Sequence, residues 1–381
     1  MEMNKRLFAD FKSQSPEEWK EKLIVDLKGK SFDDLRWENH GITGKPFYTS
    51  NDLPPVIPQL SKEHPNTEAF GHRFWVNYQF IPVNNEKEAN QKALLALQNG
   101  ADGLLFELDS LADLEILFKD IELIYCHVSF RSESLSTEEI FNHYHSYLSN
   151  SAIDLNKLNG FVDGQGFHIQ DIVTGLKTIT LKTSAQTENY SKQIALLLGE
   201  VIDIIDHKQL EAADFFNMLS IQTHLTNDYF GEIAKHRALR LAVLKLAKTY
   251  GLEIEEPMLV SLSPQWSSEI DDPHSFMLHA STQAMAAIIG GTDGLIVNPF
   301  YKVFDKNSAL AERMSRNIST ILKEESYLAK NVDPSAGSYY LESMTKSLTD
   351  ESIELLKSIE AKGGLSQLDL ASFVESKTAT V

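Results

Sequence analysis

Short apolar runs alternate along most of the chain with segments that carry apolar residues at every third or fourth position. The runs predict eight strands, at 74–82, 103–108, 124–130, near Gly160, 176–185, 216–224, 258–265 and 294–298. The segments predict helices at 86–98, 138–148, 194–205, 229–250, 275–289 and from about Leu310 to near Lys330. Eight strands with helices between them make about eight strand–helix units, which predict an α/β fold, a (β/α)8 TIM-type barrel preceded by an N-terminal helical and extended arm.

The pattern also predicts how the chain is divided. We expect an arm over 1–50, a proline-rich connector over 51–70, the barrel over 71–345, and a C-terminal helix and tail over 346–381. In the arm, Ser15-Pro16-Glu17-Glu18 is a capping box that begins a helix. The arm also carries three large aromatic residues that need a surface to bury against, Trp19, Trp37 and Phe47. That surface is either the chain's own barrel or a partner subunit.

Several predicted strands place small or polar residues on alternate positions, where an ordinary barrel of this kind has bulky branched side chains. The candidate barrel-lining residues are Ser129, Ser220, Gln222, His224, Ser261 and Ser263. Such a lining indicates either a hollow interior or a polar network in which every group has a partner. We expect the hollow interior, with an open or water-filled axis.

Composition removes several classes of function. A formal net charge of −19 argues against nucleic acid or an anionic membrane as a partner. The single cysteine, Cys126, excludes an internal disulfide and fits a reducing compartment. The N-terminus lacks the apolar core of a signal peptide, and no run approaches the 18 or so apolar residues of a membrane helix. We therefore expect a cytoplasmic protein.

The sequence shows no cysteine or histidine spacing typical of a metal site and no phosphate-binding loop motif. Asp271, Asp272 and His274 are close in sequence, but a solvated loop is the better interpretation of that cluster. Arg237 falls within the apolar stripe of a predicted helix, so its guanidinium needs a buried partner, and we expect a structural ion pair.

A set of motifs in the second half of the chain resembles the barrel domain of the methylmalonyl-CoA mutase family. These motifs are Ala284-Met-Ala-Ala287, Gly290-Gly291-Thr292, Asn298, Arg313-Met-Ser-Arg-Asn317, Lys323-Glu-Glu-Ser326 and Val332-Asp-Pro-Ser-Ala-Gly-Ser-Tyr-Tyr-Leu-Glu-Ser343. Weaker similarity reaches back through Ala234-Lys-His-Arg-Ala238, Trp75 and Lys45-Pro-Phe-Tyr-Thr49 to the N-terminus. The resemblance therefore covers nearly the whole chain.

The resemblance implies that the catalytic positions of this family are replaced. Phe80 stands where catalytic chains carry a tyrosine, Ser184 where they carry a histidine, and Asp293 where they carry a glutamine. The family's Pro-Ser-Met-Arg clamp is missing from 130–170, and no cobalamin-binding domain with an Asp-x-His-x-x-Gly motif is expected in this chain. The resemblance thus implies no catalytic residue, no cofactor-binding residue and no bound cofactor here.

These replacements are typical of a small, non-catalytic subunit. The implied role is to support the cobalamin-dependent interconversion of (R)-methylmalonyl-CoA and succinyl-CoA, as part of an isomerase heterodimer whose large catalytic subunit holds the adenosylcobalamin. Whether this chain binds a CoA ester is left open. The alternatives are the substrate-binding chain of a related acyl-CoA mutase with its cobalamin domain on a separate polypeptide, or an unrelated barrel binding protein. A barrel hydrolase is disfavoured because no histidine or carboxylate ligands recur at the strand ends.

Overall fold

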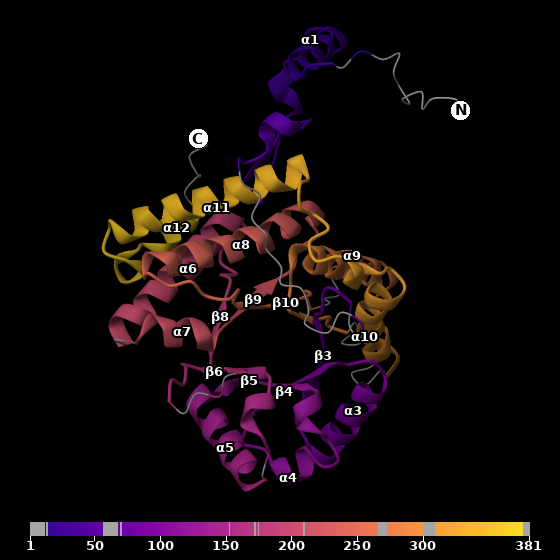
Figure 1. Ribbon diagram of the computed structural model, residues 1–381, viewed down its shortest axis with the longest axis vertical. Helices are drawn as coiled ribbons and strands as arrows, with labels where there is room; N and C mark the ends of the chain where they lie inside the picture. Colours follow the sequence, from indigo (N-terminus) through magenta and orange to yellow (C-terminus); the bar gives the residue numbers. More distant parts are fainter. Residues whose placement is uncertain are drawn as a thin grey trace, which may run out of the picture.

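A computed structural model describes residues 12, 14–55, 68, 71–151, 153–170, 173, 175–208, 210–265, 273–299 and 309–375. Figure 1 shows a ring of strands with helices on its outside. The strands are β3 (Val76–Pro82), β4 (Gly103–Glu107), β5 (His127–Ser136), β6 (Gly160–Gln165), β7 (Leu176–Lys177), β8 (Ile179–Lys182), β9 (Leu219–His224), β10 (Met258–Leu262) and β11 (Gly294–Ile296). The helices outside them are α3 (Glu86–Gln98), α4 (Leu114–Leu117), α5 (Thr137–Asn150), α6 (Tyr190–Lys208), α7 (Ala212–Met218), α8 (Tyr229–Thr249), α9 (Pro273–Gly290), α10 (Ala309–Glu324) and α11 (Tyr339–Glu360).

All nine strands belong to one parallel sheet in the order β7-β6-β5-β4-β3-β11-β10-β9-β8. The sheet is nearly closed into a barrel, because side chains join β8 to β6 across the seam. The Thr180 hydroxyl donates to the Val162 carbonyl over 2.9 Å. Lys182 Nζ lies 2.9 Å from Asp163 Oδ1. The predicted (β/α)8 TIM-type barrel is therefore confirmed.

Three predicted strands have different bounds in the structure. The run 176–185 is divided into β7 and β8, and the run 124–130 begins only at His127 but continues to Ser136. The first residues of 216–224 belong to helix α7, which buries Phe215, Phe216 and Met218. A continuous apolar run fits a buried helix as well as a buried strand, so its pattern could not place that boundary.

Helix α11 packs on α6 and α8 and belongs to the outer layer of the barrel. It runs without interruption through 345 and 346, where we expected the barrel to end. Six further residues, Leu370–Glu375, form the last helix, α12. Among the described helices, none combines the length and the apolar composition that a membrane span requires.

The arm has two parts, of which one packs on the barrel and the other does not. Its second part is a small hairpin of β1 (Trp37–Asn39) and β2 (Ile42–Gly44), which packs on the chain's own barrel. The Trp37 ring meets Tyr340 edge-on at 6.3 Å between ring centroids, and His40 stacks on Tyr190 at 4.7 Å. Of the two surfaces considered for the arm, Trp37 therefore uses the chain's own.

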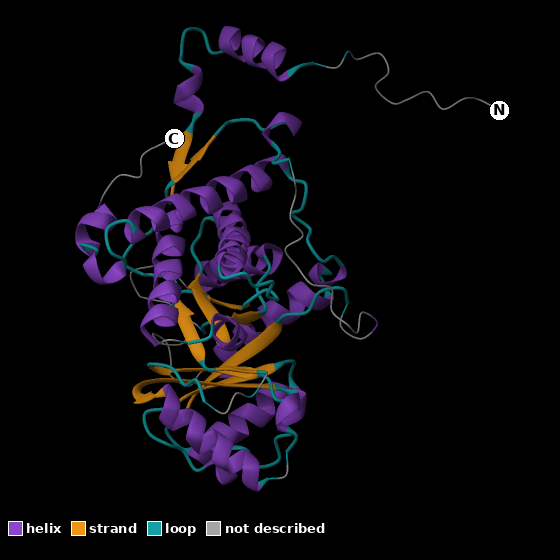
Figure 2. Ribbon diagram, turned by 60° about the vertical axis from the view of Figure 1, so that its left-hand side comes forward, coloured by secondary structure: helices purple, strands orange, loops and turns teal. Residues whose placement is uncertain are grey.

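The first part of the arm is helix α1 (Pro16–Asp26), which begins at the predicted capping box. Ser15 Oγ accepts a hydrogen bond from the Glu18 amide at 3.1 Å, and the Ser15 amide donates to the Glu18 carboxylate at 2.8 Å. None of its residues is buried, and Figures 1 and 2 show the helix clear of the barrel. Trp19 stacks on Phe47, 4.6 Å away between ring centroids. Most of the connector over 51–70 lies outside the described residues.

Bulky side chains fill the barrel axis. Alternate residues of each strand face the helices or the axis, and the axis-facing apolar cluster comprises Val76, Tyr78, Leu105, Phe161, Val260, Leu262 and Ile296. Tyr78 is 3% exposed. A Cβ added at Gly103 or Gly294 would come within 2.7 Å of the Tyr78 ring, so these two glycines make room for it. The axis is packed, and our expectation of a hollow, water-filled interior is wrong for this cluster.

Candidate functional site

The catalytic end of a (β/α)8 barrel is the end where the carboxyl termini of its strands meet. At this end five axis-facing side chains form a polar layer above the apolar cluster, and we call them the mouth layer. They are Glu107 of β4, Arg131 of β5, Asp163 of β6, Lys182 of β8 and Gln222 of β9. Strand register places them side by side, since Glu107 pairs with Arg131, Arg131 with Asp163, and Lys182 with Gln222.

Asp163 is the centre of the ion pairs in the mouth layer. Its side chain is 5% exposed and lies between two cations, with Arg131 Nε at 3.1 Å and Lys182 Nζ at 2.9 Å. Arg131 also donates through Nη2 to Gln222 Oε1 at 2.9 Å. Buried carboxylates require such charge-assisted partners. The layer thus ties four strands together at the mouth, including both sides of the β6–β8 seam.

The sequence pattern missed the three charged residues Arg131, Asp163 and Lys182. The family's Pro-Ser-Met-Arg motif is missing from 130–170, and an isolated arginine in that range belongs to no motif. A usable signal was present, because each charge directly follows a run of apolar or small residues: Val128-Ser-Phe130, Gly160-Phe-Val162 and Ile179-Thr-Leu181. In parallel strands those positions converge at one end of the barrel.

Of the six candidate lining residues, four lie at axis-facing positions of β5 and β9, and two do not. Ser129 and Ser220 face the axis and have protein partners: the Phe161 amide donates to Ser129 Oγ at 3.1 Å, and the hydroxyls of Ser220 and Thr180 lie 2.8 Å apart. Gln222 belongs to the mouth layer. His224, one inward position beyond Gln222, lies exposed at the rim. Partial burial of the ring, and then the cations Arg131, Lys235 and Lys182, lower the pKa of His224.

Ser261 and Ser263 do not line the axis. The Ser261 hydroxyl lies 2.8 Å from His236 Nε2 of α8 and donates to the Thr292 hydroxyl at 2.8 Å, so it faces the outer helix layer. Ser263 follows β10, and its hydroxyl accepts from the Asn298 amide at 2.8 Å. The expectation for these two serines is corrected, because the inward positions of β10 are held by Val260 and Leu262.

The three positions aligned with family catalytic residues do not lie together. Phe80 faces the axis on β3 and packs against the apolar cluster, and Ser184 follows β8 at the carboxyl end. Asp293 instead precedes β11, at the opposite end of the barrel. There its carboxylate accepts from Arg240 Nη2 and from the Leu259 amide, both at 2.7 Å. Asp293 is therefore part of a structural ion pair and cannot face a ligand at the mouth.

Arg237 has the structural role expected from its place in an apolar stripe. Its side chain is 1% exposed, and its guanidinium pairs with Asp333 and, over 2.7 Å, with Glu342. It also donates to the Ser335 hydroxyl at 3.1 Å. One buried arginine thus joins the motif on α8 to the motif over 332–343, two stretches about a hundred residues apart in sequence.

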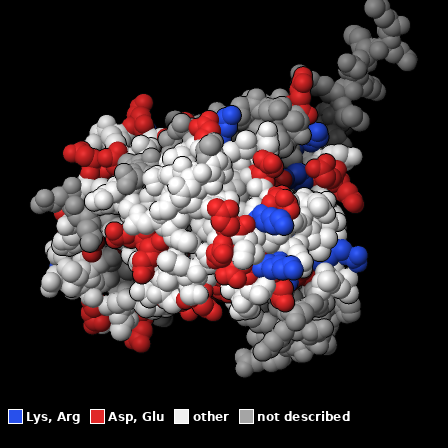
Figure 3. Space-filling view, turned by 90° about the horizontal axis from the view of Figure 1, so that it is seen from below, with Lys and Arg blue, Asp and Glu red and all other residues white. Residues whose placement is uncertain are grey.

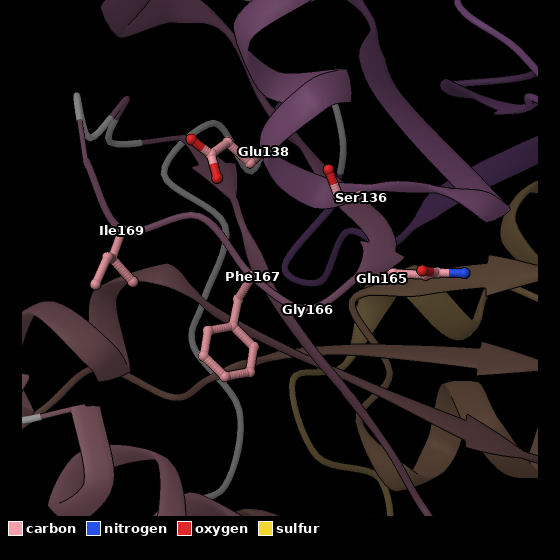
Figure 4. A pocket seen from close by; sticks show the side chains of 6 residues that line it. All are labelled: Ser136, Glu138, Gln165, Gly166, Phe167 and Ile169. Atoms are coloured by element: carbon pink, nitrogen blue, oxygen red, sulfur yellow. The ribbon is translucent and has the colours of Figure 1, made fainter.

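A separate pocket of about 280 Å³ lies where β5 and β6 end and α5 begins. Figure 4 shows its lining residues, Ser136, Glu138, Gln165, Gly166, Phe167 and Ile169, and Gln165 is directed away from the Glu138 carboxylate. Its lining includes one carboxylate and no cation. Among the described residues, no three His, Cys, Asp or Glu side chains are grouped so that they could hold a metal ion. Asp271, Asp272 and the side chain of His274 lie outside the described residues. Figure 3 shows the molecule from below, and Asp and Glu predominate over Lys and Arg on this face.

The chain is similar to known proteins over nearly its whole length. The family model described as methylmalonyl-CoA mutase matches residues 193–379. The chain is 28% identical to "Methylmalonyl-CoA mutase small subunit" of Porphyromonas gingivalis over 95% of its own length and 65% of that protein. It is 24% identical to "Methylmalonyl-CoA mutase" of Cereibacter sphaeroides, over 92% of this chain and 59% of that protein. It is 25% identical to "Methylmalonyl-CoA mutase, mitochondrial" of Homo sapiens, over 92% of this chain and 56% of that protein.

The chain therefore spans less than two thirds of the length of each of these relatives, but nearly all of its own length is matched. The matches include both stretches that Arg237 joins, and they accompany a barrel with the strand–helix order that the resemblance implied. Residues 193–379 of this protein therefore belong to the methylmalonyl-CoA mutase family.

Proposed function

We propose that this chain is the small, non-catalytic subunit of a methylmalonyl-CoA mutase. The observation that carries the proposal is the similarity over 95% of the chain to a protein named as a small subunit. In this role the chain supports the interconversion of (R)-methylmalonyl-CoA and succinyl-CoA by a large partner subunit, in the cytoplasm. Adenosylcobalamin is expected on that partner, where it supplies the radical for the rearrangement.

The geometry of the barrel supports a non-catalytic role. Tyr78 and Phe161 occupy the axis, which the pantetheine arm of a CoA ester would need to enter. Ser184, at the position of the family's histidine, donates no imidazole proton to a thioester carbonyl, and Phe80 has no hydroxyl. The cations at the mouth, Arg131 and Lys182, are both paired with Asp163 and do not form a free carboxylate clamp.

The isolated chain is expected to turn over no methylmalonyl-CoA when adenosylcobalamin is added, and to leave the cofactor's visible spectrum unchanged. Co-expression with a large mutase subunit is expected to give a stable heterodimer that is active. Spectrophotometric assay and size-exclusion chromatography of both preparations measure this. Turnover by the chain alone would contradict the proposal. Turnover only with a separate cobalamin-binding polypeptide would support the related acyl-CoA mutase instead.

Helix α1 is the part of the arm best suited to contact the partner. Ile24 and Val25 are 47% and 70% exposed, although both are large apolar residues. Deleting the whole arm would also remove Trp37 and His40, which pack on the chain's own barrel, so point substitutions are the sharper test.

The double substitution Ile24→Glu with Val25→Glu is expected to weaken co-elution with the large subunit by at least about tenfold in affinity, because two charges would enter an apolar contact. The melting temperature of the isolated chain should stay the same, since α1 has no buried residue. Leu278→Glu is the control, because Leu278 is 70% exposed on α9. Unchanged co-elution of the double variant would show that the partner does not bind α1.

A further inference from the structure

A pocket of about 310 Å³ lies between helix α6 and the segment 365–375 that follows α11. Five of its lining residues are leucines: Leu196 and Leu197 of α6, and Leu365, Leu368 and Leu370 of the segment. Ligand-binding pockets in proteins have volumes of about 300–1,000 Å³, so this one suits a small molecule. An aliphatic wall of this kind binds the apolar chain of a ligand by removing it from water.

The segment 365–375 is attached to α6 at both of its ends. At the first end, Leu365 packs against Gly199 of α6, where an added Cβ would come within 2.9 Å of the Leu365 side chain. At the second end, Lys192 Nζ donates to the Val374 carbonyl at 2.9 Å and lies 5.5 Å from the centroid of the Phe373 ring. The Lys192 side chain is buried by these contacts. The pocket between the two attachments is therefore a part of the fold.

The lining of the pocket includes one carboxylate that is accessible and unpaired. Glu200 of α6 is exposed, and it forms no hydrogen bond or ion pair with any described residue. Partial burial, and then the nearby carboxylate of Asp203, raise the pKa of Glu200. Asp203 and Glu360 flank Gly364, since a Cβ added there would lie 3.4 and 4.0 Å from their carboxylate oxygens. This end of the pocket therefore carries a negative charge that a cationic ligand would offset.

The cation in the lining, Lys182, does not neutralise Glu200. Its Nζ lies 2.9 Å from Asp163 Oδ1, and Lys182 is not among the groups that shift the pKa of Glu200. The described carboxylates are not grouped so that they could hold a metal ion. The combination of an apolar wall with an unpaired carboxylate therefore favours an organic cation.

We propose that this pocket binds a small aliphatic amine, with its ammonium group on Glu200 and its alkyl chain among the five leucines. An ammonium group donates charge-assisted hydrogen bonds to a carboxylate, and its charge also reduces the repulsion between Glu200 and Asp203. A carboxylic acid with the same chain would instead bring a second negative charge to Glu200. The inference does not depend on the subunit role proposed above, because it uses only side chains of α6 and of the segment 365–375.

Titration calorimetry of the full chain with hexylammonium chloride, against sodium chloride at equal ionic strength, tests the proposal. The expected result is saturable binding of one hexylammonium per chain, with a melting temperature that rises with its concentration. Hexanol and ammonium chloride should each bind at least about tenfold more weakly, because each lacks one half of the ligand. Butylammonium should also bind more weakly, by up to about fourfold for each methylene removed.

Three results would contradict the proposal. Absence of saturable hexylammonium binding beyond the sodium chloride control would overturn it as a whole. Hexanol binding as tightly as hexylammonium would overturn the contact between ammonium and carboxylate. Ammonium chloride binding as tightly as hexylammonium would overturn the role of the leucines.

Two substitutions test the position of the site. Glu200→Gln keeps the size of the side chain and removes its charge, so hexylammonium affinity should fall at least about tenfold, while the melting temperature without the amine stays the same. Leu368→Ala should weaken binding by about fivefold, since less apolar surface leaves water. Glu354→Gln is the control, because Glu354 is an exposed carboxylate of α11 that pairs with Lys357, and it should bind as wild type does. Equal hexylammonium affinity in Glu200→Gln and wild type would refute the proposed site.

Discussion

Tyr78→Ala is expected to destabilise the protein by about 3–5 kcal/mol, as is typical when a buried aromatic side chain is removed from a packed core. The Tyr78 ring packs against Phe161 at 5.6 Å between ring centroids, and Gly103 and Gly294 leave the space that it fills. The lost ring would leave a cavity that backbone glycines cannot close. Urea denaturation of the variant and of wild type measures the loss.

Two control variants separate packing from other effects. Tyr125→Ala removes a ring that is 82% exposed, and it should leave the denaturation midpoint almost unchanged. Tyr78→Phe keeps the ring and loses only a long hydrogen bond from Ser129, 3.4 Å between oxygens, so its effect should be small. If Tyr78→Ala and Tyr125→Ala had equal midpoints, the axis would not be packed.

Arg237→Met is expected to cost about 3–5 kcal/mol of stability, because it leaves two carboxylates in a buried environment without their cation. Glu342 is 1% exposed and the Asp333 side chain 9%, so water cannot replace the guanidinium well. The affected contact joins α8 to the stretch at the start of α11. Thermal or urea denaturation measures the effect.

A double variant tests whether the cost comes from the unpaired charge. Adding Glu342→Met to Arg237→Met removes one buried carboxylate and should restore part of the lost stability. Lys346→Met breaks an exposed ion pair with Asp350 and should change stability by at most about 1 kcal/mol. A double variant less stable than Arg237→Met would show that Glu342 stabilises the fold through other contacts.

The residue pattern predicted the elements whose local signals agree with one another. Helix α3 was predicted from its apolar pattern over the bounds that the structure has, and in the structure Asn85 caps its first turn. The capping box at Ser15 likewise gave the start of α1. Such signals act over three or four residues, so they need no knowledge of the rest of the fold.

Alternation of small and polar residues did not predict the barrel interior. Alternation gives two faces for each strand, but it does not say which face points to the axis. For β9 the polar face points inward, with Ser220 and Gln222, whereas for β10 the apolar face does. Whether the axis is hollow also depends on residues of other strands. Here Tyr78 of β3 fills the space that Gly103 and Gly294 leave.

The barrel, the arm helix and the family resemblance could be predicted from the residue pattern, because each depends on periodicity, short-range capping or a long series of motifs in order. The side chains at the mouth and along the axis could not be predicted, because their positions depend on how the strands assemble. Arg131, Asp163 and Lys182 are 19 to 51 residues apart, and no local pattern relates them. They meet because parallel strands bring their carboxyl ends to one place, which is a property of the closed sheet and not of any single segment.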